Sequence, residues 1–272
     1  MHGASWRWGV LAMVITAAAA GVPAPARAQP SDIGRALAPA GRLRVAVWWL
    51  DYFAVADPAS GRLKGVIPDL GEELARRISV PAELIRFDTP AAIIAAFRSG
   101  TVDVTFLGIT ADRAEAMTFG PAVIDLQTTY LVPPQSTIAT IDGVDRPGIR
   151  IAVPARSAQE AHLRKTLVNA ALVPVPAEAP DQAELVARGE ADAFSHVMPM
   201  LAKAQAFLPG SRILSGSYFN VPVAIASGKD RPPAVADYCR GFIEDVKASG
   251  FVGEAIARAG VPGLVVSGGN VR

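Results

Sequence analysis

The stretch Gly100–Arg113, which reads G-T-V-D-V-T-F-L-G-I-T-A-D-R, decides the fold class. Its first glycine is typical of a helix end, and an alternating apolar run from Val102 to Phe106 then predicts a strand. The strand passes through Gly108 into a helix that Thr110 starts. Free backbone N–H groups at such a junction are where open α/β sheets hold their ligands.

Arg113 lies in the first turn of that predicted helix, where its positive charge opposes the helix dipole. An anionic ligand beside the helix start would explain the arginine. A surface arginine on a solvated turn is the alternative that these residues alone leave open.

Strand and helix patterns alternate on the N-terminal side of this stretch. Strands are predicted at 43–47 and 82–87. Apolar residues recur every four positions over 66–78, which predicts an amphipathic helix, and Thr89 with Pro90 starts another. The strand–helix–strand order predicts a parallel sheet covered by helices.

A second α/β set follows Pro133-Pro134, which indicates an exit from a first lobe. Ser157 with Glu160, and Asp181 with Glu184, form capping boxes for two helices in this half. Further strands are predicted at 128–132, 149–153, 172–175, 191–194 and 218–226, and the last helices at 234–246 and 251–259. The glycine-rich end of the chain, 263–272, is predicted to be a flexible tail.

Residues 1–28 resemble a secretory signal peptide, with Arg7 before an apolar run and Ala26-Arg27-Ala28 as the cleavage site. An uncleaved anchor is the alternative. Cleavage removes two arginines and no acid, so the net charge falls from +1 to −1 and no nucleic-acid partner is expected. Cys239 is the only cysteine, so it cannot form an intramolecular disulfide and is expected to be a small core residue.

Enzyme and metal motifs are missing from the sequence. After the leader only His162 and His196 remain, neither at metal-ligand spacing, and His196 is the better functional candidate because it follows a strand. There is no G-x-S-x-G elbow and no phosphate-binding loop. We therefore expect no catalytic residue, no metal and no cofactor.

The order of motifs resembles the bacterial solute-binding protein family 3, the periplasmic receptors of amino-acid-type ABC importers. The resemblance covers about 43–260 and depends on four stretches: Leu43–Val47 before an aromatic patch, Gly65–Leu70 leading into Glu73–Arg77, Phe97–Val104, and Thr110–Arg113. It implies a type II-like periplasmic-binding-protein fold with two α/β lobes, two hinge strands and a ligand cleft between the lobes. Lobe 1 would be discontinuous (29–132 plus 223–262), and lobe 2 would be 133–222.

The resemblance also implies a site. In relatives that bind α-amino acids, an arginine at the position of Arg113 grips the ligand carboxylate, helped by groups at positions that are Gly108 and Thr110 here. In the second lobe Arg156 stands where the family usually has glycine, followed by Ser157. No carboxylate stands near His196, where relatives hold the ligand ammonium.

We therefore expect the ligand to be a small carboxylate. Arg156 is a candidate second cation for it, and the other end of the ligand would contact Trp49, Phe53 and Val197. Trp49 and Phe53 could instead cap a core edge, and Arg156 could simply face solvent. The function implied is a periplasmic, monomeric receptor that delivers its solute to an ABC permease.

Two other functions share this fold. One is a dehydratase acting on a cyclic acid, for which His196, Asp51 and Asp125 are the candidate acids or bases. The other is a receptor that presents its ligand to a sensor protein. The sequence does not separate transport from signalling.

Overall fold

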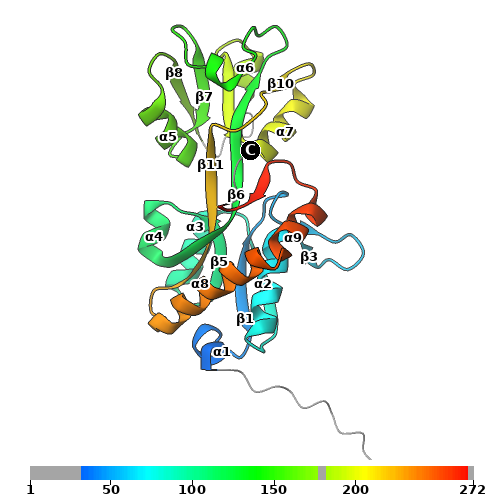
Figure 1. Cartoon of the computed structure of the whole chain (residues 1–272), viewed down its shortest axis with the longest axis vertical. Coiled ribbons are helices and arrows are strands. Elements are labelled where there is room, and N and C mark those ends of the chain that lie inside the picture. Colours follow the sequence, from blue (N-terminus) through cyan, green and yellow to red (C-terminus); the bar gives the residue numbers. More distant parts are fainter. Residues whose placement is uncertain (1–31, 177–181, 269–272) are drawn as a thin grey trace, which may run out of the picture.

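The computed structural model describes residues 32–176 and 182–268, which form two α/β lobes stacked along the long axis in Figure 1. The predicted signal peptide (1–28) and the predicted helix cap at Asp181 lie outside these residues. No described helix is both long and apolar enough to cross a membrane.

The elements alternate as the sequence patterns predict. The helices are α1 (Asp32–Leu37), α2 (Val66–Arg77), α3 (Pro90–Arg98), α4 (Ala111–Ala116), the 3-10 helix η1 (Ile141–Gly143), α5 (Ala158–Thr166), α6 (Glu184–Ala187), α7 (Met198–Phe207), α8 (Pro233–Ala248) and α9 (Phe251–Ala259). The strands are β1 (Leu43–Trp48), β2 (Val55–Ala56), β3 (Leu63–Lys64), β4 (Ala82–Phe87), β5 (Val104–Gly108), β6 (Met117–Val132), β7 (Arg150–Pro154), β8 (Ala171–Val175), β9 (Ala193–Val197), β10 (Arg212–Ile213), β11 (Phe219–Gly228) and β12 (Leu264–Val266).

One sheet runs through both lobes in the order β4-β1-β5-β11-β6-β9-β7-β8. Within each lobe the consecutive strands are parallel: β4, β1 and β5 in one, β8, β7 and β9 in the other. Because β11 is antiparallel to both β5 and β6, while β9 is antiparallel to β6, the two sets run toward each other. The carboxyl ends of β1, β5, β7 and β9 therefore meet between the lobes, at the edge where such sheets bind ligands.

Strands β6 and β11 pass from one lobe into the other (Figure 1). The sequence predicts only the end of β6, at 128–132, because Gly120 and Pro121 interrupt the apolar pattern of its first half. Residues Thr128–Leu131 already pair with β9 of the second lobe, earlier than the expected crossing near Pro133-Pro134. The domain boundaries at 132 and 222 stay a prediction.

The C-terminal segment differs from the flexible tail that the sequence predicts for 263–272. Leu264–Val266 form β12, which pairs with β6 on the side that β11 leaves free. Leu264 is buried, and a Cβ on Gly263 would lie 2.4 Å from Cβ of Met198, so only glycine allows this approach to α7. Small residues suggested a tail, but the edge of β6 offers them backbone partners. Residues 269–272 lie outside the described residues.

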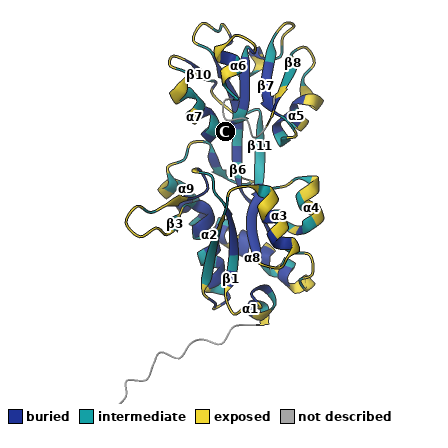
Figure 2. Cartoon of the chain, turned by 180° about the vertical axis from the view of Figure 1, so that it is seen from behind, coloured by how far each residue is buried: buried dark blue, intermediate teal, exposed yellow. Residues whose placement is uncertain are grey.

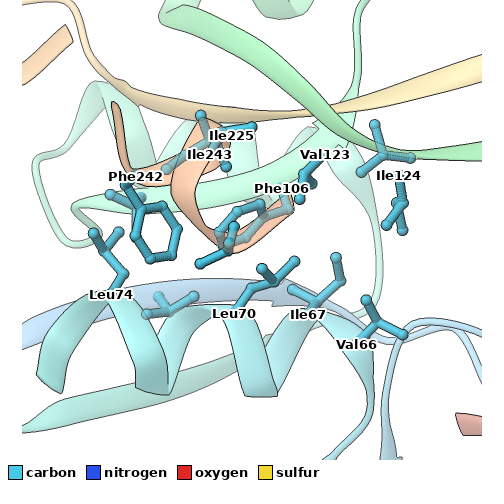
Figure 3. Close-up of a cluster of buried hydrophobic side chains, with 14 of the residues drawn as sticks. Val66, Ile67, Leu70, Leu74, Phe106, Val123, Ile124, Ile225, Phe242 and Ile243 are labelled. Atoms are coloured by element: carbon cyan, nitrogen blue, oxygen red, sulfur yellow. The ribbon is translucent and has the colours of Figure 1, made fainter. Parts of the chain in front are cut away.

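The larger core lies in the lobe that holds both ends of the described chain. Helix α2 buries Leu70 and Leu74 against Phe106 of β5 and Phe242 of α8, as Figure 3 shows. Burying each such side chain contributes about 1.5–3 kcal/mol. The buried strands lie between exposed helix faces in both lobes (Figure 2), and Cys239 is buried in this core as predicted.

Both lobes have the same arginine–aspartate pair at the amino-terminal ends of their strands, away from the carboxyl ends. Asp103 accepts hydrogen bonds from the backbone N–H of Arg44 (2.9 Å) and from its guanidinium (2.8 and 3.0 Å). Asp192 does the same with Arg150, at 2.8 Å for the backbone and 3.1 and 3.2 Å for the guanidinium. Asp192 therefore serves the strand–turn structure, and the two lobes share a repeated arrangement that the sequence does not make evident.

Candidate ligand-binding site

Arg113 projects from α4 back over the end of β5. Its Nη1 donates to the carbonyl oxygen of Gly108 (2.7 Å), and its Cζ lies 5.7 Å from the ring centroid of Trp48. Burial lowers the pKa of this half-buried guanidinium, while Asp112 and Tyr52 oppose that shift. No ion pair joins Arg113 to any residue in 32–176 or 182–268. Most of its five N–H donors therefore remain available for an anion.

Thr110 and Gly108 lie where the sequence predicts, at the strand–helix junction. Thr110 is the N-cap residue of α4, but its hydroxyl donates to the carboxylate of Asp112 (2.5 Å) and makes no bond to the helix backbone. Gly108 is half-buried, and a Cβ on it would lie 3.5 Å from Nη1 of Arg113. A side chain larger than alanine would therefore crowd the guanidinium.

The aromatic patch after β1 contributes a different tryptophan from the one predicted. Trp48 lies beside Arg113, whereas the ring of Trp49 is covered by the guanidinium of Arg86, whose Cζ lies 4.1 Å from the ring centroid. Phe53 is buried and packs edge-on against Tyr52 at 4.6 Å, so it caps the core edge. Strand ends fix which way neighbouring side chains point, and the sequence does not show where β1 stops.

The second lobe brings the start of α5 to the cleft edge. Ser157 is the N-cap residue, and its Oγ accepts from the backbone N–H of Glu160 (3.0 Å), so half of the predicted capping box is confirmed. The Glu160 carboxylate accepts instead from the backbone N–H of Arg156 (2.6 Å) and from Arg164. The Arg156 side chain is exposed, as in the solvent-facing alternative.

Arg156 has a left-handed backbone, with φ of 59°, at the position where the resemblance expects glycine. A non-glycine residue there costs about 1–2 kcal/mol. We expect Arg156→Gly to be more stable than Arg156→Ala by about 1 kcal/mol in urea unfolding, the reverse of the order at an ordinary position. If alanine proves equal to glycine or better, position 156 is not strained.

The end of β9 turns its residues to alternate faces. Ser195 bonds to the Tyr218 hydroxyl (2.5 Å) on the α5 side, and Val197, 3% exposed, packs in the first lobe's core cluster. His196 lies on the other face, where its ring meets Phe194 edge-on at 5.6 Å. Its Nδ1 accepts from the backbone N–H of Val197 (2.7 Å), and burial lowers the pKa of His196 to about 4. The ring is therefore neutral at pH 7, and Val197 is a buried core residue.

The chain is similar to a known protein family in sequence and in architecture. The family model described as bacterial extracellular solute-binding proteins, family 3, matches residues 52–258. The chain belongs to this family. No curated protein sequence matches it.

Solved structures of family-3-like proteins share the two-lobed fold at low sequence identity. An ancestral cationic amino-acid solute-binding protein superposes with a TM-score of 0.60 at 21% identity, covering 84% of this chain and 99% of the other. A binding component of an ABC transporter from Wolinella succinogenes, complexed with lysine, gives 0.61 at 22% identity, covering 80% and 95%. An ancestral cyclohexadienyl dehydratase gives 0.52 at 18%, covering 85% and 97%.

The candidate acids and bases of a dehydratase are dispersed in this family-3 chain. Asp51 pairs with Lys203 of α7 (2.5 Å), which also links the two lobes. Asp125 lies on β6 between β11 and β12, and His196 lies on the far face of β9. No hydrogen bond or ion pair among the described residues joins any two of them.

No group of three or more His, Cys, Asp or Glu side chains in the described part of this family-3 protein is suited to hold a metal ion. His162 is the residue that sequence reasoning undervalued. Its ring stacks on Phe219 at the start of β11, with centroids 4.4 Å apart. The sequence signal for this contact is the aromatic pair Tyr218-Phe219 at the start of a predicted strand.

Proposed function

We propose that this family-3 protein is a periplasmic receptor that binds a small carboxylate-bearing solute by lobe closure and delivers it to the permease of an ABC importer. The observation that carries the proposal is Arg113, a half-buried guanidinium with one carbonyl partner and no described carboxylate. An arginine fork suits a carboxylate because two N–H groups can bind both oxygens. The receptor works as a monomer and needs no cofactor.

The surroundings of Arg113 favour a ligand without a cationic group. The ring of Trp48 lies beside the guanidinium, and a Cβ on Gly108 would lie 3.5 Å from Nη1 of Arg113 and 3.6 Å from Cγ1 of Val221. An ammonium buried there would lack a carboxylate partner, which is costly in a desolvated site. An organic acid therefore fits this site better than a standard α-amino acid.

Closure needs contacts from both lobes. A ligand shifts the population toward the closed state only if it binds that state more tightly than the open one. Groups of the second lobe must therefore touch the solute. The start of α5, with Ser157, and the end of β9 supply those groups, opposite Arg113 and Trp48.

A thermal-shift panel of matched compounds tests the proposal on the mature protein. The compounds are leucine, 4-methylpentanoate, 4-methyl-2-oxopentanoate and 3-methylbutylamine, which share one apolar body. We expect the two acids to raise the melting temperature, leucine to do so less, and the amine not at all. Stabilisation by leucine with none by the two acids would overturn the proposed ligand class, and stabilisation by the amine alone would overturn the anionic site.

A further inference from the structure

Four aromatic rings form a column that runs from the second lobe's core to the hinge strand β11. Tyr130, which is buried, stacks on Tyr218 with centroids 4.7 Å apart and an interplanar angle of 21°. His162 of α5 lies 5.8 Å from Tyr218 and stacks on Phe219 at 4.4 Å and 17°. The inner rings are anchored, since Tyr218 bonds to Ser195. Phe219, half-buried, is the outer end of the column.

The column ends on the strand that also carries Val221, which lies close to Gly108 at the base of Arg113. Phe219 and Val221 pair with Thr128 and Leu126 of β6 without a register shift, so both side chains point to the same face of β11. A Cβ on Gly108 would touch Cγ1 of Val221 (3.6 Å) and Nη1 of Arg113 (3.5 Å). One strand face therefore leads from Arg113 past Val221 to Phe219. Figure 1 shows α4 and α5 on the same side of β11.

The side chains along this face of β11 are Val221 and Phe219, and His162 packs beside them, so the face presents an aliphatic group and two flat rings. Burial and the charge of Lys165 lower the pKa of His162, so its ring is neutral at pH 7. No ion pair among the described residues involves His162, and Val221 adds only methyl groups. Aromatic faces and edges prefer another ring at a centroid distance of about 4.5–7 Å over an aliphatic group of similar size.

We infer that Phe219 and His162 form a subsite for a planar ring, so that the solute is an aromatic monocarboxylate with its carboxylate on Arg113 and its ring against this pair. The inference rests on the proposed function for the carboxylate anchor. Residue Phe219 belongs to the hinge strand and His162 to the second lobe. Ring binding therefore joins a ligand held by the first lobe to the second.

The test compares 3-phenylpropanoate with 3-cyclohexylpropanoate, which has the same chain and a puckered ring, by isothermal titration. We expect the aromatic acid to bind about tenfold more tightly to the parent protein. In Phe219→Leu that preference should fall to about twofold or less. His162→Leu is a second variant with the same expectation, in case Phe219→Leu does not fold. Phe207→Leu is the matched control, because Phe207 is 84% exposed on α7, and it should keep the full preference.

The outcomes separate the two ideas. If both acids bind through Arg113 with equal affinity, or if neither Phe219→Leu nor His162→Leu reduces the preference, the ring subsite is overturned while the carboxylate receptor stands. If neither these acids nor the 4-methylpentanoate pair bind, the proposed function fails, and the ring subsite fails with it.

Discussion

Arg113→Ala is expected to weaken binding of the carboxylate solute by about 2–5 kcal/mol, which is roughly 30-fold to several thousand-fold in Kd. The loss is large because the guanidinium is half-buried and packed over Trp48, so water screens its charge poorly. Folding should change little, since the side chain gives up one hydrogen bond to Gly108 and no described ion pair.

Two further variants isolate the cause of that loss. Arg113→Lys keeps the charge but loses the fork, so binding should fall to an intermediate level. Arg98→Ala removes an exposed arginine at the end of α3 and should bind as the parent does. Isothermal titration with 4-methylpentanoate measures all three, and an unchanged Kd in Arg113→Ala would rule out the anchor.

Much of the fold could be predicted because local patterns and tertiary packing agree. The four-residue recurrence from Val66 becomes the buried face of α2, and the Thr89 hydroxyl caps α3 by accepting from Ala92. Both signals are short-range, so a single sequence contains them. Where structure depends on a distant partner, prediction failed: β12 exists only because β6 has a free edge there.

The site could be predicted less well. Arg113 was identified because a cation in a first helical turn is unusual. The sequence did not show which of two adjacent residues faces the site, because a shift of one residue at a strand end exchanges the two faces of the strand. That exchange puts Trp48 beside Arg113 in place of Trp49, and it puts His196 beside Phe194 on the face of β9 opposite Ser195. His162 was missed because its ring partner, Phe219, lies far away in sequence.

Asp103→Asn is expected to lower the free energy of unfolding by about 3–5 kcal/mol. The carboxylate is 0% exposed and bonds to two guanidinium groups, those of Arg44 and Arg231, which are 16% and 14% exposed. An amide has the same shape but no charge, so two nearly buried cations would lose the carboxylate that both of them bind. Replacing one partner of a buried ion pair costs far more than the net value of the pair.

Asp192→Asn is the matched control within the same molecule, because Asp192 holds Arg150 by the same backbone and side-chain hydrogen bonds. Here the side chains are 35% and 43% exposed, and water can solvate the arginine that the mutation leaves unpaired. Its cost should stay within about 1 kcal/mol. Urea unfolding followed by circular dichroism compares the two midpoints. Equal losses would mean that burial does not set the strength of these ion pairs, whereas a large loss confined to Asp103→Asn would assign the difference to the dry environment and the second arginine.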